Sequence, residues 1–162
     1  MKLLLSIILL PIVLAACSDG MHSAPTQSVV DRTYSSDGER IYFTGQSESG
    51  RLIKGVGGHH HMQIHGGSCV TCHGVKREGG VRMFPWFWVM APPLTTAALV
   101  EDHEDEEHAH DTYAANSLKK AITDGINPAG KQLDNLMPRW TMADKDLESL
   151  VHFLLSESES TY

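Results

Sequence analysis

The sequence has only three cysteines among its 162 residues, and it is poor in positive charge. Three cysteines are too few for a fold held together by disulfides. Lysine and arginine number 13 against 20 aspartate and glutamate residues, which gives a formal net charge of −7. Because phosphate binding needs a basic surface, nucleic acid is excluded as a partner. Hydrophobic residues make up 41% and charged residues 20%, which is typical of one globular domain rather than a disordered chain.

Residues 1–16 begin with a positive charge at Lys2, and a long apolar run follows it. The run is too short and too poorly flanked for a stable membrane span, which favours a secretory signal peptide. Residues 17–36 are rich in Ser, Asp, Gly, Pro and Thr, and this composition predicts a flexible tether. We therefore expect one folded domain over residues 37–156 and a polar tail over residues 157–162.

The stretch Leu14-Ala15-Ala16-Cys17 resembles the lipobox of bacterial lipoproteins. The resemblance implies that Cys17 is lipidated and that the protein is anchored in the cell envelope, facing the periplasm. A serine rather than an aspartate follows the cysteine, which favours the outer membrane under the sorting rule of some Gram-negative bacteria. The alternative is ordinary cleavage that leaves Cys17 unmodified, although an exposed free thiol is a liability.

The other two cysteines lie in the motif Cys69-Val70-Thr71-Cys72-His73, which is typical of covalent haem attachment. Two thiols three positions apart can add to the two vinyl groups of one haem, and His73 then lies under the iron as the proximal ligand. We therefore expect one haem c per chain. A thioredoxin-like redox pair and half of a zinc site are the alternatives. The first usually needs a βαβ pattern, which is not evident, and the second a further pair of ligands.

Methionine and proline follow each other further along the chain, at Met137 and Pro138, ahead of a predicted C-terminal helix. Residues 37–155 resemble the class I, monohaem cytochrome c family. The resemblance is carried by the C-x-x-C-H motif, this M-P-x-W run and the predicted terminal helix. The resemblance implies an all-α fold, in which three to four helices and long loops surround one covalently bound haem. It also implies that Met137 is the distal ligand, a soft thioether that raises the haem potential. Core packing is the alternative role for Met137. The rival ligands are Met83, Met90, Met142 and the extra histidines.

Local patterns predict several helices. Apolar residues at helical spacing before the polar tail predict a last helix, with Thr141 as its cap. Asn116 is expected to cap a helix over residues 117–124. A short helix is expected over residues 73–76, because nearby glycines are poor helix formers. By the family resemblance, Gly38 in the first helix allows a close crossing by the last helix.

Four more residues are expected in the haem surroundings, namely Pro92, Pro93, Arg139 and Trp140. By the resemblance, a backbone carbonyl of Pro92 or Pro93 accepts a hydrogen bond from the proximal histidine, which fixes its ring. A plain rigid turn is the alternative for this segment. Arg139 and Trp140 carry N–H donors that suit a haem propionate. A solvent-facing Arg139 is equally consistent with the sequence.

Two further features depart from the family pattern. Residues 83–90 form an apolar cluster, interpreted as a wall of the haem pocket or as an exposed patch that docks a redox partner. Two tracts, residues 57–65 and 101–110, hold seven of the ten histidines. Imidazole with carboxylate or methionine suits copper, nickel or zinc. The acidic second tract is most simply a solvated loop.

These features predict an electron carrier and not an enzyme. We expect one-electron transfer between a respiratory dehydrogenase and an acceptor, by a free carrier or a subunit of such a complex, with redox proteins as partners. The alternative is a metal-handling or sensing haem lipoprotein that uses its histidine tracts. A peroxidase or gas-binding haem protein would need an open sixth position, and the Met137 loop argues against one.

Overall fold

The computed structural model of the chain describes residues 32–58, 60–82, 88–101 and 112–156. The predicted signal peptide, nearly all of the tether with Cys17, and the polar tail lie outside these residues. The helices are α2 (Asp37–Thr44), α3 (His60–His65), α4 (Val70–His73), α5 (Thr96–Val100), α6 (Ala115–Thr123) and α7 (Asp144–Leu155). Two short strands, β1 (Lys54–Val56) and β2 (Arg139–Thr141), form an antiparallel pair. None of the helices in the described ranges is long and apolar enough to cross a bilayer.

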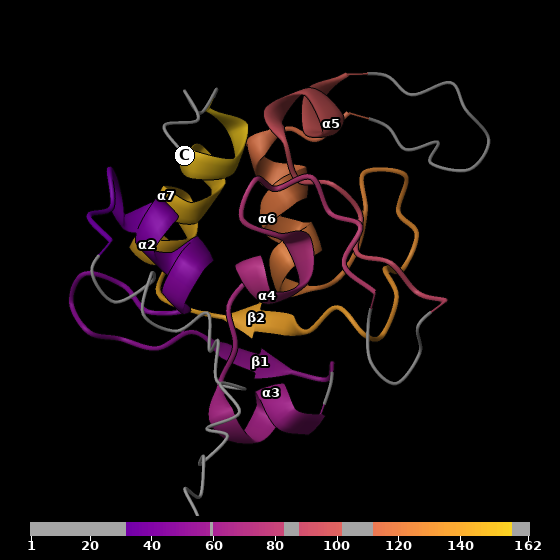
Figure 1. Cartoon of the computed structure of the whole chain (residues 1–162). Coiled ribbons are helices and arrows are strands. Elements are labelled where there is room, and N and C mark those ends of the chain that lie inside the picture. Colours follow the sequence, from indigo (N-terminus) through magenta and orange to yellow (C-terminus); the bar gives the residue numbers. More distant parts are fainter. Residues whose placement is uncertain (1–31, 59, 83–87, 102–111, 157–162) are drawn as a thin grey trace, which may run out of the picture.

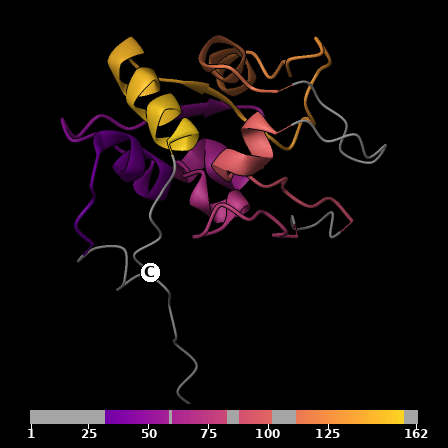
Figure 2. The same ribbon diagram turned by 90° about the horizontal axis from the view of Figure 1, so that it is seen from above.

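The core is organised around a crossing of α2 and α7, which come from opposite ends of the domain. Both views show α2 in indigo lying against α7 in yellow (Figures 1 and 2). Gly38 makes the crossing close, because a methyl group on it would overlap the Ser149 carbonyl and lie 2.8 Å from Cβ of Phe153. Next to this contact, Tyr42 and Leu150 are almost completely buried. The close crossing expected at Gly38 is therefore confirmed.

Both ends of α2 are fixed by local hydrogen bonds. The Ser36 hydroxyl accepts a hydrogen bond from the N–H of Glu39 at 3.1 Å, so Ser36 caps the first turn. Gly45 ends the helix in the left-handed conformation, with φ of 68°, and its N–H donates to the Ile41 carbonyl.

Two of the predicted helix caps are wrong. Thr141 does not cap α7, because it belongs to β2 and pairs with Lys54 across the small sheet. The N-cap of α7 is Ala143 instead. Helix α6 begins before Asn116, which consequently lies in its first turn. In both places a capping residue type was present, but the chain enters the helix at a different point.

The described fold is mostly helical, as predicted, but it has more elements than the three to four helices expected. The short helices α3 and α5 and the β1–β2 pair were not predicted. The sheet pairs segments that are far apart in the sequence, with Gly55 opposite Trp140. This pairing fixes the position of the segment that precedes α7.

A buried cation closes the C-terminus of α7. Arg77 is 4% exposed, and its Nη1 donates to the carbonyls of Phe153 and Leu154, each at 3.1 Å. Its guanidinium carbon also lies 4.9 Å from the centre of the Phe153 ring. The last carbonyls of a helix lack partners within the helix and carry partial negative charge, so a cation there is stabilising. The contact joins the turn after α4 to the end of α7.

Candidate functional site

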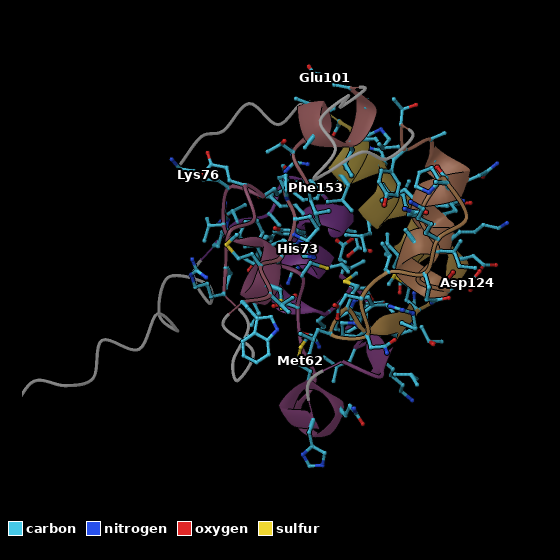
Figure 3. The ribbon with its side chains drawn as sticks, turned by 90° about the vertical axis from the view of Figure 1, so that its right-hand side faces the viewer. Met62, His73, Lys76, Glu101, Asp124 and Phe153 are labelled. Carbon is cyan, nitrogen blue, oxygen red and sulfur yellow. The ribbon has the colours of Figure 1, made fainter. Side chains whose placement is uncertain are left out.

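A cavity of about 480 Å³ lies between α4, α6, α7 and the loops beside them. Its lining is largely apolar and includes Met62, Leu99, Tyr113, Leu118, Trp140 and Leu150. The same cavity is lined by Cys69, Cys72, His73 and Met137, so the structure brings these four predicted residues together. Figure 3 shows His73 near the middle of the molecule, between Phe153 and Met62.

Helix α4 explains why two thiols and an imidazole meet at one cavity. Cys69 is its N-cap, and the N–H of His73 donates to the Cys69 carbonyl at 2.9 Å, which closes one turn. Positions i, i+3 and i+4 share a helix face, so Cys69, Cys72 and His73 lie on the same side. Gly74, with φ of 79° and ψ of 162°, ends the helix directly afterwards. The short helix therefore includes the motif and does not follow it over residues 73–76 as predicted.

The turn of α4 is also attached to the helical core. The hydroxyl of Tyr42, on α2, donates to the Gly74 carbonyl at 2.7 Å. Since Tyr42 is fully buried at the α2–α7 crossing, the position of the motif is set by the packing of those two helices.

The His73 ring is held by the proline-containing loop. Its Nδ1 lies 2.8 Å from the Pro92 carbonyl oxygen and donates to it, so Pro92 rather than Pro93 supplies this acceptor. Desolvation lowers the pKa of the His73 imidazole, and the bond to Pro92 opposes this shift without cancelling it. The neutral ring, only 5% exposed, then keeps Nε2 as its one nitrogen able to bind a metal.

Backbone contacts fix the Pro92 carbonyl in this place. Gly79 has φ of 68°, and a Cβ atom on it would lie 2.7 Å from the Pro92 carbonyl oxygen, so the two segments are in close contact. The N–H of Leu94 donates to the Arg77 carbonyl at 2.7 Å. Because the Arg77 side chain is bound to the end of α7, the loop behind the imidazole is connected to the core.

Three methionines line the cavity. Met137, in the segment between α6 and β2, is partly buried against the core. Met62, on α3, is 9% exposed, and Met90 is 53% exposed. Of the other rivals, Met142 is not part of the lining, and Met83 lies outside the described residues. Met62 was not predicted at the cavity, because it lies between His61 and Gln63 in a tract interpreted as a candidate site for a second metal.

Arg139 and Trp140 have different environments, although they are adjacent. Trp140 is 3% exposed and lines the cavity. The Arg139 guanidinium donates to the backbone carbonyls of Met137 and Leu133, and Arg139 is not part of the lining. The partners of its guanidinium are therefore carbonyls of its own loop, and the residue as a whole is half-buried.

Burial raises the pKa of both thiols of the motif. Desolvation, followed by repulsion from Cys72, raises the pKa of Cys69 to about 12, and desolvation also raises the pKa of Cys72. Redox-active thiol pairs have surroundings that lower the thiol pKa. The environment therefore does not support a thioredoxin-like pair. In the described ranges no three His, Cys, Asp or Glu residues are grouped so that they could hold a metal ion, so these residues supply no second pair of ligands for the zinc alternative.

Other predictions concern segments that lie partly outside the described residues. The structure does not describe residues 83–87 of the apolar cluster or residues 102–110 of the acidic tract. Of the cluster, Val89 and Met90 line the cavity, whereas Trp88 is 73% exposed. Metal binding by the histidine tracts stays a prediction.

The sequence model of the family described as cytochrome c matches residues 61–158, which is more than half of the chain. The chain belongs to the cytochrome c family. The matched range contains α4, the proline loop, the Met137 segment and α7. It does not contain α2, although the predicted resemblance over residues 37–155 begins with that helix. Comparison with curated proteins and with solved structures gives no match.

Membership of the cytochrome c family implies a covalently bound haem c and haem-based electron transfer. The residues of the cavity fit that group. Two free thiols lie on one helical turn, and an imidazole beside them has only Nε2 available. A thioether lines the same, largely apolar, cavity. Thioether bonds, an imidazole and a methionine sulfur are the attachments that haem c and its iron accept.

Proposed function

We propose that this chain is a monohaem c-type cytochrome that carries one electron at a time and is not an enzyme. The observation that carries the proposal is the meeting of the α4 motif and Met137 at one apolar cavity. In this proposal Cys69 and Cys72 would form the thioether bonds to a haem, and His73 and Met137 would bind its iron. Bound haem supplies an iron that alternates between the ferric and ferrous states.

The contribution of the protein is to keep the surroundings of the iron unchanged between those two states. The imidazole of His73 is held by Pro92 on one side and by the turn of α4 on the other. A largely apolar lining disfavours water around a bound haem, so little solvent would have to reorganise when the charge changes. Both properties favour rapid electron transfer over chemistry on a substrate.

Absorption spectra of the purified protein test the ligand assignment. We expect a far-red sulfur–iron band in the oxidised protein and no response to carbon monoxide in the reduced protein. Met137→Leu keeps the side-chain volume but removes the sulfur, so it should abolish the band and allow carbon monoxide to bind. Met62→Leu is the matched control, because Met62 lines the same cavity, and it should leave both properties unchanged.

Either of two results would contradict this assignment. If Met62→Leu removes the band and Met137→Leu does not, the ligand is Met62. If the unmodified protein is high-spin and binds carbon monoxide readily, the sixth position is open, and an enzyme or a gas-binding protein becomes the better description.

We also propose that Cys17 carries a lipid that anchors the protein to the envelope, on the periplasmic side and by preference in the outer membrane. The support is the lipobox-like sequence before Cys17. There the chain would pass electrons between a respiratory dehydrogenase and an acceptor, or serve as a subunit of such a complex.

Changing the anchor residue should move the protein without changing its haem. In a Cys17→Ser strain we expect the protein to leave the membrane fraction, with an unchanged haem spectrum. Cell fractionation and mass spectrometry of the N-terminus measure these outcomes. Recovery of the unmodified protein in the soluble periplasmic fraction would disprove the anchor.

A further inference from the structure

The guanidinium of Arg139 lies within the loop that carries Met137. Its Nη1 donates to the Met137 carbonyl and its Nη2 to the Leu133 carbonyl, the latter at 3.0 Å. The two acceptors are four residues apart, so one side chain bridges both ends of residues 133–137. The backbone of Arg139 is itself fixed, because Arg139 pairs with Val56 in the β1–β2 sheet.

Gly125 provides the space for this guanidinium. It has φ of 69°, and a Cβ atom on it would collide with Cζ and Nε of Arg139. The N–H of Leu133 also donates to the Gly125 carbonyl at 2.7 Å. The planar group is therefore enclosed between the turn after α6 and the loop it bridges. A lysine could place a charge there, but it lacks the fork that reaches two acceptors.

The loop has few other contacts that fix its shape. Residues 133–137 belong to no helix or strand. The local hydrogen bonds run from the N–H groups of Leu136 and Met137 to Asp134. One further bond joins the Asn135 carbonyl to the N–H of Gly58. The two bonds from Arg139 are charge-assisted and therefore stronger than the neutral backbone bonds of this loop. Of the other bonds, the one from Leu136 to the Asp134 carboxylate is also charge-assisted, but it spans only two residues.

We infer that Arg139 is a positioning residue that holds the sulfur of Met137 at the cavity and so keeps the sixth coordination position closed. The inference rests on the proposed function, because it takes Met137 as the distal ligand. The role is separate from the bond to a propionate that the sequence predicted, because it uses the two bonds to carbonyls of the Met137 loop.

Imidazole added to the ferric, haem-containing protein measures how often the loop opens, because it binds only when the methionine sulfur has left. Apparent affinity rises in proportion to the open fraction. Loss of hydrogen bonds from a charged group should raise that affinity by about tenfold to a hundredfold in Arg139→Gln. Arg139→Lys should give a smaller increase. As denaturant is added, both variants should lose the sulfur–iron band at a lower concentration than the one at which their helical circular dichroism signal is lost.

Arg51→Gln is the matched control. Arg51 also has a bridging guanidinium, but it binds Asp146 on α7, away from the Met137 loop. The control should lower the denaturant midpoint and leave the affinity for imidazole within about twofold of the unmodified protein. If the Arg139 variants behave like this control, the positioning role is disproved.

The outcomes also separate this inference from the proposed function. If the unmodified protein has no sulfur–iron band, the ligand assignment itself fails. If Met137→Leu abolishes the band but both Arg139 variants bind imidazole like the unmodified protein, only the positioning role fails. If Arg139→Gln does not fold, Arg139→Lys alone decides, and an unchanged affinity for imidazole in that variant overturns the inference.

Discussion

Replacing Gly38 with alanine is expected to reduce the free energy of unfolding by about 3 kcal/mol. The added methyl group would overlap the Ser149 carbonyl, which is backbone within α7 and cannot rotate away. The direction of the effect is informative. Alanine is the better helix former by about 1 kcal/mol, so propensity alone predicts stabilisation. Denaturant unfolding followed by circular dichroism measures the difference.

Gly130→Ala is the matched control for the Gly38 variant. Gly130 has φ of 76°, and a methyl group added to it would meet no atom within 4 Å, so the change costs backbone strain without a collision. We expect a loss of about 1 kcal/mol. A Gly38→Ala protein as stable as the unmodified one would show that α2 and α7 do not approach as closely as described.

Replacing both Cys69 and Cys72 with alanine is expected to abolish covalent haem attachment completely. Cys69 and Cys72 are the only cysteines in the part of the chain that the structure describes, so no thioether bond could form from these residues. The apolar lining would then lose its packing partner, and the variant should also unfold with reduced cooperativity. Intact-protein mass spectrometry and haem staining after denaturing electrophoresis measure the attachment.

Single replacements and the third cysteine complete this experiment. Cys69→Ala or Cys72→Ala leaves one thiol on the turn of α4, and each should keep some haem through a single bond. Cys17→Ser should keep all of its haem, because its thiol belongs to the proposed anchor. Haem that remains covalently attached in the double variant would contradict the assignment of the motif.

Much of the site could be predicted because its chemistry is local in sequence. The C-x-x-C-H motif is one helical turn, and its spacing alone places two thiols and an imidazole on one face. The apolar spacing before the polar tail likewise predicted α7. In these cases, the residues that determine the structure are neighbours in the chain.

The rest depends on contacts that a local pattern does not contain. Thr141 has the side chain of a helix cap, but pairing with Lys54 places it in a strand. Arg77 has a φ of 62°, a conformation that arginine rarely adopts. Its side chain is bound to the distant end of α7, and this contact favours the unusual backbone conformation. The carbonyl partners of Arg139 could not be predicted either, since they depend on how the Met137 loop folds back.

The meeting of α2 with α7 also determines when the domain can fold during synthesis. Residue 38 is synthesised long before residue 149. At about 5–20 residues per second, the interval is on the order of 5 to 20 seconds. Throughout that time α2 has no partner at its glycine face, and the turn of α4 has no finished core to attach to. The haem cavity itself has to wait for α7 in the same way, because Leu150 and Leu154 of that last helix form part of its lining.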